Sequence, residues 1–285
     1  MTPIRFVKFH GFGNDYIVIE REQIPDGVGL SYLATTICNR HTGVGSDGIA
    51  VLEKRSGAEA DYFCEIVNPD GSVAGFSGNG TRCAVAFLHY KGVWTDKKLR
   101  LETRSGIKTY ELIERKGPGE FWFEAEIGKP QFASDLIPVA NISWRQAVVN
   151  ERITINGDIH SFSAVNVGNP VACVFVETFA FDWRSVGRAM EVHEVFPLKA
   201  NIVFVKIHDL ENIEIRIWER AAGETSSSGT CSSAAAVMSA FTLKTDRAVN
   251  VKAEGGTTRV VWRQDDEIVI NGRADLAFSG EWLVD

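Results

Sequence analysis

The alternation of apolar and polar residues along the chain predicts many short strands and few helices. In the first half, strands separated by turns rich in Gly, Asn and Asp are expected at 4–9, 16–20, 49–53, 61–67, 98–103, 107–114 and 121–127. In the second half, strands are expected at 153–155, 161–167, 171–176, 202–208, 212–218, 249–253, 257–263 and 267–271. Helical spacing of apolar residues occurs at 31–40, 81–90, 183–190 and 230–241. Many strands with two central helices predict an α+β fold.

Two short polar segments, each following a run of strands, resemble one another. Ser77–Gly80 leads into the expected helix at 81–90, and Ser228–Thr230 opens the expected helix at 230–241. This internal duplication predicts a pseudo-symmetric pair of lobes. Turns are expected at 10–15 and 221–229, and Ser31 is expected to cap the first helix.

The ends of the two duplicated helices suggest a chemistry. A helix N-terminus presents free backbone N–H groups and roughly half an elementary positive charge. Two such ends aimed at one cleft predict a carboxylate pocket. A proton-transfer group at each end, on opposite faces of an α-carbon, would make a racemase without a cofactor. The simpler alternative is that each serine only caps its helix.

Composition and charge narrow the class of protein. The 285 residues are 45% hydrophobic and 24% charged, which suits two folded lobes. A net charge of −7 argues against nucleic acid as a main partner, because phosphate binding needs clustered Lys and Arg. The five cysteines form no CxxC pair, so no metal site is expected. The sequence shows no signal peptide and no apolar run long enough to span a bilayer, so a cytoplasmic protein with free thiols and no membrane partner is expected.

Several motifs, in order along nearly the whole chain, resemble those of the diaminopimelate epimerase family. In the first half, Lys8–Tyr16 resembles K-x-H-G-x-G-N-D-[FY], and Asn39–Gly48 resembles N-R-x-x-G-I-G-x-D-G. Asn68–Ser72 resembles N-x-D-G-S, and Ser77–Cys83 resembles C-G-N-G-x-R-C. In the second half, G-N-P-H and E-R-G-x-G-E-T resemble Gly168–Val171 and Glu219–Thr225. The resemblance implies an α+β fold of two pseudo-symmetric lobes, each a mixed β-sheet wrapped around a central helix, with the active site in the cleft between them.

The resemblance also implies where the lobes lie and what they do. One lobe is expected at 1–127 plus 276–285 and the other at 128–275, with the boundary at Gly128–Pro130. The implied function is a cofactor-independent amino-acid epimerase or racemase, of the type that converts LL- to meso-diaminopimelate in lysine biosynthesis. The implied partner is a small-molecule amino acid, and a homodimer is left open.

By the same resemblance, the α-carbon end of the substrate binds between the two helix N-termini. The expected binding residues are Asn14, Asn68, Gly78, Asn79, Asn169, Asn201, Glu219, Arg220, Gly229 and Thr230. The helix-end residues would offer backbone N–H groups, with Arg220 for the carboxylate and Glu219 for the ammonium group. Each asparagine could instead satisfy its own turn, and the Glu219–Arg220 pair could be surface charge at a strand end.

The catalytic positions depart from the family. Ser77 and Ser228 stand where the family has its two cysteines, and serine needs an adjacent base that the local sequence does not supply. Val171 replaces a family histidine, and Ala221 a family glycine. Cys231 replaces a second glycine and is either a displaced base or a core residue.

Three explanations of the two serines remain open. The chain could be an epimerase of altered chemistry, an amino-acid-binding homologue without turnover, or a protein whose serines were introduced to trap substrate. A related lyase or isomerase, such as a hydroxyproline dehydratase or a phenazine-pathway isomerase, is a further alternative.

Overall fold

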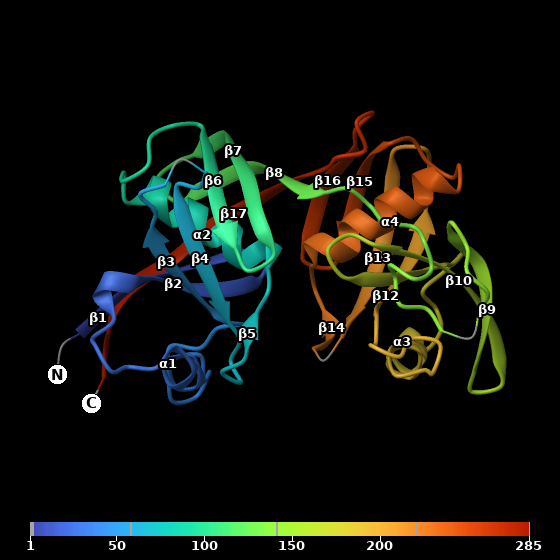
Figure 1. The fold of residues 1–285 in the computed structure, drawn as a ribbon, viewed down its shortest axis with the longest axis horizontal. Coiled ribbons are helices and arrows are strands. Elements are labelled where there is room, and N and C mark those ends of the chain that lie inside the picture. Colours follow the sequence, from blue (N-terminus) through green and yellow to red (C-terminus); the bar gives the residue numbers. More distant parts are fainter. Residues whose placement is uncertain (1–2, 58, 141, 221, 285) are drawn as a thin grey trace. The chain divides into compact units, whose positions relative to one another are not determined.

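The computed structural model describes residues 3–57, 59–140, 142–220 and 222–284, so Ala221 lies outside the described residues. Contacts within the chain divide it into two compact units (Figure 1). Unit 1 consists of Met1–Ala125 and Asn271–Asp285, and unit 2 consists of Glu126–Ile270. Each unit is built from strands around one long helix (Figure 1).

The strands of unit 1 form a closed circuit. They are β1 (Pro3–Gly11), β2 (Asn14–Glu20), β3 (Ile49–Lys54), β4 (Tyr62–Val67), β5 (Val73–Ala74), β6 (Lys98–Thr103), β7 (Gly106–Lys116), β8 (Glu120–Gly128) and β17 (Ile268–Leu283). Pairing runs β1–β2–β3–β4–β6–β7–β8–β17 and returns to β1, and β5 pairs with β4. The Leu276 N–H donates to the Gly119 carbonyl at 2.8 Å beside the β8–β17 pair. This closure leaves no free edge along the circuit.

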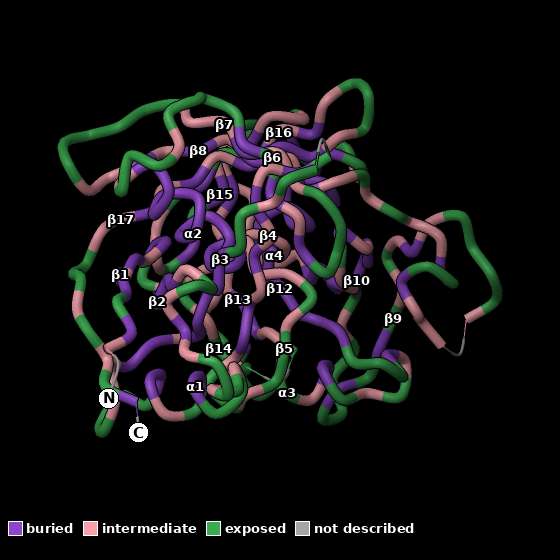
Figure 2. The backbone as a smooth tube through the Cα atoms, turned by 60° about the vertical axis from the view of Figure 1, so that its left-hand side comes forward, coloured by how far each residue is buried: buried purple, intermediate pink, exposed green. Residues whose placement is uncertain are grey.

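The helix α2 (Gly78–Tyr90) lies inside this circuit and packs against β1, β2, β3 and β4. Eleven of its thirteen residues are buried. A helix that is buried on all sides belongs in the centre of a core, whereas an amphipathic one lies at its surface. Helix α1 (Leu30–Ile37) is amphipathic, because it buries only Leu33, Ala34 and Ile37. Figure 2 shows buried backbone concentrated in the strands and central helices, and exposed backbone in the loops.

Unit 2 repeats the order of elements found in unit 1. Its elements are β9 (Val148–Ile155), β10 (Asp158–Asn166), β11 (Pro170–Phe175), α3 (Trp183–Glu191), β12 (Asn201–Ile207), β13 (Asn212–Glu219), β14 (Gly223–Thr225), α4 (Gly229–Phe241), β15 (Ala248–Ala253) and β16 (Gly256–Trp262). Parallel pairing joins β11 to β12 and β13 to β15, as it joins β2 to β3 and β4 to β6 in unit 1. Antiparallel pairs such as β1–β17, β3–β4, β10–β11, β12–β13 and β15–β16 accompany them, so the pairing in both units is mixed. In both units, the second parallel connection passes through the central helix.

The expected fold class is confirmed: the fold is α+β, with a mixed sheet around a central helix in each half. The strands expected from the alternation are present, although the strand expected at 267–271 continues to Leu283. Its second half pairs with β1, with Pro3 opposite Leu283, so the first and last strands lie side by side (Figure 1). The short strand β14 lies in the segment expected to be a loop.

Two local expectations were wrong. The turn expected at 10–15 is confined to Phe12 and Gly13, whose positive φ angles of 53° and 89° suit a two-residue hairpin turn. Helix α1 begins one residue before Ser31, with Gly29 as its N-cap. It ends at Ile37 because the Ile37 carbonyl accepts the N–H groups of Val44 and Gly45 at 2.9 and 3.0 Å.

Within the part of the chain that the structure describes, no helix has both the length and the apolar character that crossing a bilayer requires.

The loop after α1 depends on a glycine. A Cβ atom at Gly43 would lie 2.6 Å from the Ile37 carbonyl oxygen and closer still to that of Thr36. Because these are backbone atoms, the substitution Gly43→Ala is expected to lower the free energy of unfolding by about 2 kcal/mol or more. Urea unfolding midpoints test this, with Gly57→Ala as the control because a Cβ there meets nothing within 4 Å. Equal midpoints for the two variants would contradict the expectation.

Candidate functional site

Each central helix begins after a serine whose hydroxyl caps it. Ser77 Oγ accepts the Gly80 N–H at 3.1 Å, and Ser228 Oγ accepts the Cys231 N–H at 3.4 Å. Both serines have extended backbone, as N-cap residues do. Both serines therefore cap their helices as expected, but the remaining contacts of their hydroxyls go beyond capping.

The first-turn residues lie where the sequence analysis expected them. Gly78 and Asn79 open α2, and Gly229 and Thr230 open α4. Helical geometry leaves the N–H groups of these positions without an intrahelical acceptor, and the macrodipole makes both ends positive. Each unit therefore contains one helix end suited to an anion.

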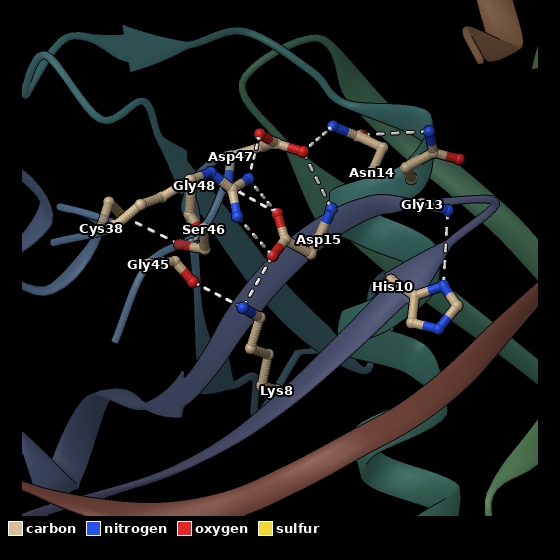
Figure 3. Close-up of polar contacts among 12 residues, drawn as sticks. Lys8, His10, Gly13, Asn14, Asp15, Cys38, Gly45, Ser46, Asp47 and Gly48 are labelled. Atoms are coloured by element: carbon tan, nitrogen blue, oxygen red, sulfur yellow. Dashed lines mark hydrogen bonds and ion pairs between the residues drawn. The ribbon is translucent and has the colours of Figure 1, made fainter. Parts of the chain in front are cut away.

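In unit 1, a run of hydrogen bonds fixes two of the expected asparagines. The Asn79 amide donates to Asn14 Oδ1 at 3.1 Å, and the Asn14 amide donates to Asp47 Oδ2 at 2.7 Å. The buried Arg82 in turn donates to Asn79 Oδ1. The structure thus brings Asn14 and Asn79 together. The Asn14 amide nitrogen points to the Asp47 carboxylate (Figure 3).

Next to Asn14 lies an ionic cluster that the sequence analysis did not single out. Asp15 contacts Lys8 Nζ and Arg40 Nη2, each at 2.7 Å, and its carboxylate also accepts the Asp47 N–H at 3.0 Å (Figure 3). Burial alone would raise the pKa of Asp15, but the hydrogen bonds from Arg40 and Lys8 outweigh it and lower the pKa to about 2. Lys8 also donates to the Gly45 carbonyl at 2.6 Å. The cluster ties the β1–β2 hairpin to the loop that follows α1.

Asn68 behaves differently from the other two asparagines of unit 1. Its amide donates to Ser72 Oγ at 2.9 Å, and its N–H donates to the Ser72 carbonyl at 2.8 Å. Both bonds lie within one turn, which is the alternative weighed for each asparagine. A role for Asn68 in binding stays a prediction.

In unit 2, the Ser228 hydroxyl donates to Glu219 Oε1 at 2.6 Å. Burial raises the pKa of the Glu219 carboxyl, and the hydrogen bond from Ser228 offsets part of that rise. A carboxylate that accepts a hydrogen bond from a hydroxyl is placed to take the proton of that hydroxyl as it reacts. The local sequence offered no base beside either serine, so this base was missed. Pairing of β13 with β14, which places Glu219 opposite Gly223, folds the chain back toward the start of α4.

The neighbouring Arg220 is exposed and makes different contacts. Its guanidinium donates to the Leu198 carbonyl at 3.2 Å, and its N–H donates to the buried Asn201 Oδ1 at 2.8 Å. Arg220 lies just beyond the last residue of β13, and its guanidinium bonds to a different group from the one that the Glu219 carboxylate contacts. The surface-charge alternative therefore fits Arg220 and not Glu219, whose carboxylate binds Ser228.

Asn169 lies beside the first turn of α4. Its amide contacts Thr230 Oγ1 at 3.4 Å, while its buried Oδ1 has no hydrogen-bond partner among the described residues. Ser228 Oγ is also 3.4 Å from Thr230 Oγ1. These contacts bring Asn169, Thr230 and Ser228 together in unit 2. Roles in binding for Asn169, Asn201 and Arg220 stay predictions.

The five thiols are buried. The Cys231 side chain is fully buried, and burial raises its pKa well above the ordinary value, so the hypothesis of a displaced base is wrong. The other four cysteines, Cys38, Cys64, Cys83 and Cys173, are also buried, which raises their pKa values too. Among the described residues, no three His, Cys, Asp or Glu side chains gather as a metal site would require.

The Asp15 cluster predicts a pH dependence of stability. The folded pKa of about 2 lies below the unfolded value of about 3.9, so its contribution is present above pH 4 and is lost as the pH falls toward 2. Asp15→Asn is expected to lower the free energy of unfolding at pH 7 by about 1 kcal/mol, since half-exposed Arg40 lets solvent screen the pair.

Urea unfolding between pH 2 and 7 measures the effect, with the exposed Asp26→Asn as the matched control. The Asp15 variant should lose less stability than the wild type as the pH falls through this range. A parallel loss in both proteins would show that the cluster does not contribute.

Comparison with known proteins identifies the family of this chain. A model of the diaminopimelate epimerase family matches residues 6–132 and 163–277. A curated diaminopimelate epimerase from Caldanaerobacter subterraneus subsp. tengcongensis is 38% identical over 279 residues, covering 98% of this chain and 99% of that relative. One from Methanococcus maripaludis is 34% identical over 284 residues, again covering 98% and 99%.

Solved structures share the fold at lower sequence identity. A hydroxyproline epimerase from Agrobacterium vitis has a TM-score of 0.70 at 14% identity, covering 100% of this chain and 92% of its own. A predicted epimerase from Pseudomonas aeruginosa has a TM-score of 0.71 at 15% identity, covering 99% and 100%. The sequence matches run almost from end to end, and the chain belongs to the diaminopimelate epimerase family.

Proposed function

We propose that this protein is a cofactor-independent amino-acid epimerase of the diaminopimelate epimerase type, with Ser77 and Ser228 in the two proton-transfer positions. The contact of 2.6 Å between Ser228 Oγ and the Glu219 carboxylate carries the proposal. It supplies the base that a serine needs in order to act where the family has a thiol. The curated relatives that match nearly the whole chain are named diaminopimelate epimerases, which makes diaminopimelate the first substrate to test.

In the proposed site, the α-carboxylate binds at a helix N-terminus, where backbone N–H groups and the positive end of the macrodipole favour an anion. The residues proposed to bind substrate are Asn14, Asn68, Gly78, Asn79, Asn169, Asn201, Glu219, Arg220, Gly229 and Thr230. The orientation of Asn14 and Asn79 by their own hydrogen bonds supports a positioning role for both. The substrate is the one partner this proposal requires. A homodimer, a cytoplasmic location and a place in lysine biosynthesis remain predictions.

Proton abstraction in unit 2 would proceed as a coupled transfer. The substrate α-proton passes to Ser228 Oγ as the Ser228 proton passes to Glu219 Oε1. The electron pair of the broken C–H bond stays on the α-carbon, and the positive end of α4 stabilises the negative charge. A raised pKa makes the Glu219 carboxylate a stronger proton acceptor than an ordinary glutamate.

A second candidate function is amino-acid binding without turnover. The observation that favours it is the absence of an accessible thiol, because all five cysteines of the sequence are buried. The same helix ends and asparagines would then bind the α-carbon end of an amino acid and leave its proton in place.

Deuterium exchange separates the two functions. Incubation with LL-diaminopimelate in D2O, followed by mass spectrometry and chiral chromatography, is expected to show slow α-deuterium incorporation with formation of the meso isomer. Restoring both thiols in a Ser77→Cys/Ser228→Cys variant should accelerate the reaction, because a thiol at a helix N-terminus ionises near neutral pH. Calorimetric binding without exchange in the wild type, but with exchange in the double variant, would favour the binding function. The absence of exchange in both proteins would exclude this substrate.

The proposed base predicts the effect of a single substitution. Glu219→Gln should slow exchange by about 100-fold or more, which is the usual contribution of a general base. Because Glu219 accepts a proton only when ionised, the wild-type rate should fall as the pH drops through its raised pKa, and the variant should lack this acid limb. Exchange rates against pH test this, with the exposed Glu224→Gln as the matched control. Unaltered rates or an unaltered pH profile would remove Glu219 from the mechanism.

A further inference from the structure

The hydroxyl of Tyr16, on β2, lies 2.8 Å from Ser77 Oγ. Tyr16 is 6% exposed, so the contact is made from inside the strand circuit. The two residues are 61 positions apart and come together because α2 is enclosed by the strands that include β2. Ser77 therefore has a phenol beside it, as Ser228 has a carboxylate.

Two glycines hold the Tyr16 ring in place. A Cβ atom at Gly48 or at Gly80 would lie 2.8 Å from Tyr16 Cε1, which is closer than real Cβ contacts come. The ring thus fills the space that both side chains would need. A ring so enclosed delivers its hydroxyl to one point with little freedom, at the positive end of α2.

The bonds of Ser77 Oγ leave its hydroxyl able to pass a proton. The oxygen has one O–H donor and two lone pairs, and one lone pair accepts the Gly80 N–H. When the Tyr16 phenol donates to the second lone pair, both lone pairs of Ser77 Oγ are occupied. The serine proton then points away from Tyr16 and from the Gly80 N–H. A phenol has an ordinary pKa of about 10, whereas serine has no accessible anion near neutral pH.

We propose that Tyr16 and Ser77 form a proton relay, in which Ser77 contacts the substrate and the phenol of Tyr16 supplies the proton. This inference rests on the proposed function. A carbanion takes the Ser77 proton as Ser77 Oγ takes the Tyr16 proton, so a C–H bond forms, two O–H bonds break and one O–H bond is remade. The negative charge moves from the α-carbon to the phenolate, which the positive end of α2 stabilises. In the opposite direction, every transfer is reversed.

The relay gives the two serines different proton-transfer partners. The carboxylate of Glu219 suits proton removal through Ser228, whereas the neutral phenol of Tyr16 suits proton return through Ser77. Removal and return are separate events that different isotope measurements detect. Exchange requires one group that removes and returns the α-proton, whereas inversion requires both groups.

The substitution Tyr16→Phe therefore tests the relay directly. It leaves the ring between the glycines and removes only the hydroxyl. In D2O, starting from the isomer whose proton Ser228 removes, deuterium should still enter the starting isomer while formation of the opposite isomer falls about 100-fold. From the other isomer, exchange and inversion should both fall. Runs from LL- and from meso-diaminopimelate cover both cases.

Two controls separate this role from a structural one. Tyr110→Phe removes another buried phenol that bonds to α2, through Thr81 Oγ1 at 2.5 Å, and should keep the wild-type ratio of inversion to exchange. In a Ser77→Cys background, the thiol supplies its own proton, so Tyr16→Phe should lower inversion by less than about tenfold.

The relay would be overturned if Tyr16→Phe lowered the inversion rate equally in the wild type and in the Ser77→Cys background. An unaltered ratio of inversion to exchange in Tyr16→Phe would also overturn it. Absence of exchange in the wild type would overturn the proposed function, and the relay with it. Loss of inversion alone in Tyr16→Phe, restored by the thiol, is the result expected only of the relay.

Discussion

The burial of most of one helix among the strands of each unit is the constraint on which the other features depend. A helix enclosed on all sides needs small or apolar residues around its whole circumference, and α4 meets this need with runs of Ala and Ser. Its first N–H groups cannot all be left to water, so each central helix begins at a capping serine. Enclosure thus fixes the position and direction of two positive helix ends. The neighbouring strands then decide which side chains surround each end.

The duplicated framework carries different chemistry in its two copies. Both units use the same order of hairpins and parallel crossovers, so both serines occupy equivalent places. The partner of Ser77 comes from β2, and the partner of Ser228 from the end of β13. A phenol that holds its proton can donate it, whereas an ionised carboxylate can only accept one. The duplication therefore supplies two similar helix ends, and the strands around them make the two ends unequal.

Much of the fold could be predicted from periodicity because alternation and helical spacing reflect which side of an element is buried. The longer strands and both central helices were predicted in this way, whereas the short strands β5 and β14 were not. Predictions failed where a contact distant in sequence decides the structure. The extension of β17 to Leu283 depends on pairing with β1, and the end of α1 depends on N–H groups from the next loop. No local pattern near Ser31 distinguishes a cap from a residue inside the helix.

The sequence alone determined the family motifs, the two serines at the helix ends and the set of residues around them, because these follow from residue identity and order. Only the tertiary structure decided which side chains touch. It directed Glu219 to Ser228 and Tyr16 to Ser77, kept Asn68 within its own turn and buried Cys231. The physical reason is that strand register sets the face on which each side chain emerges, and register depends on pairing between residues far apart in the chain.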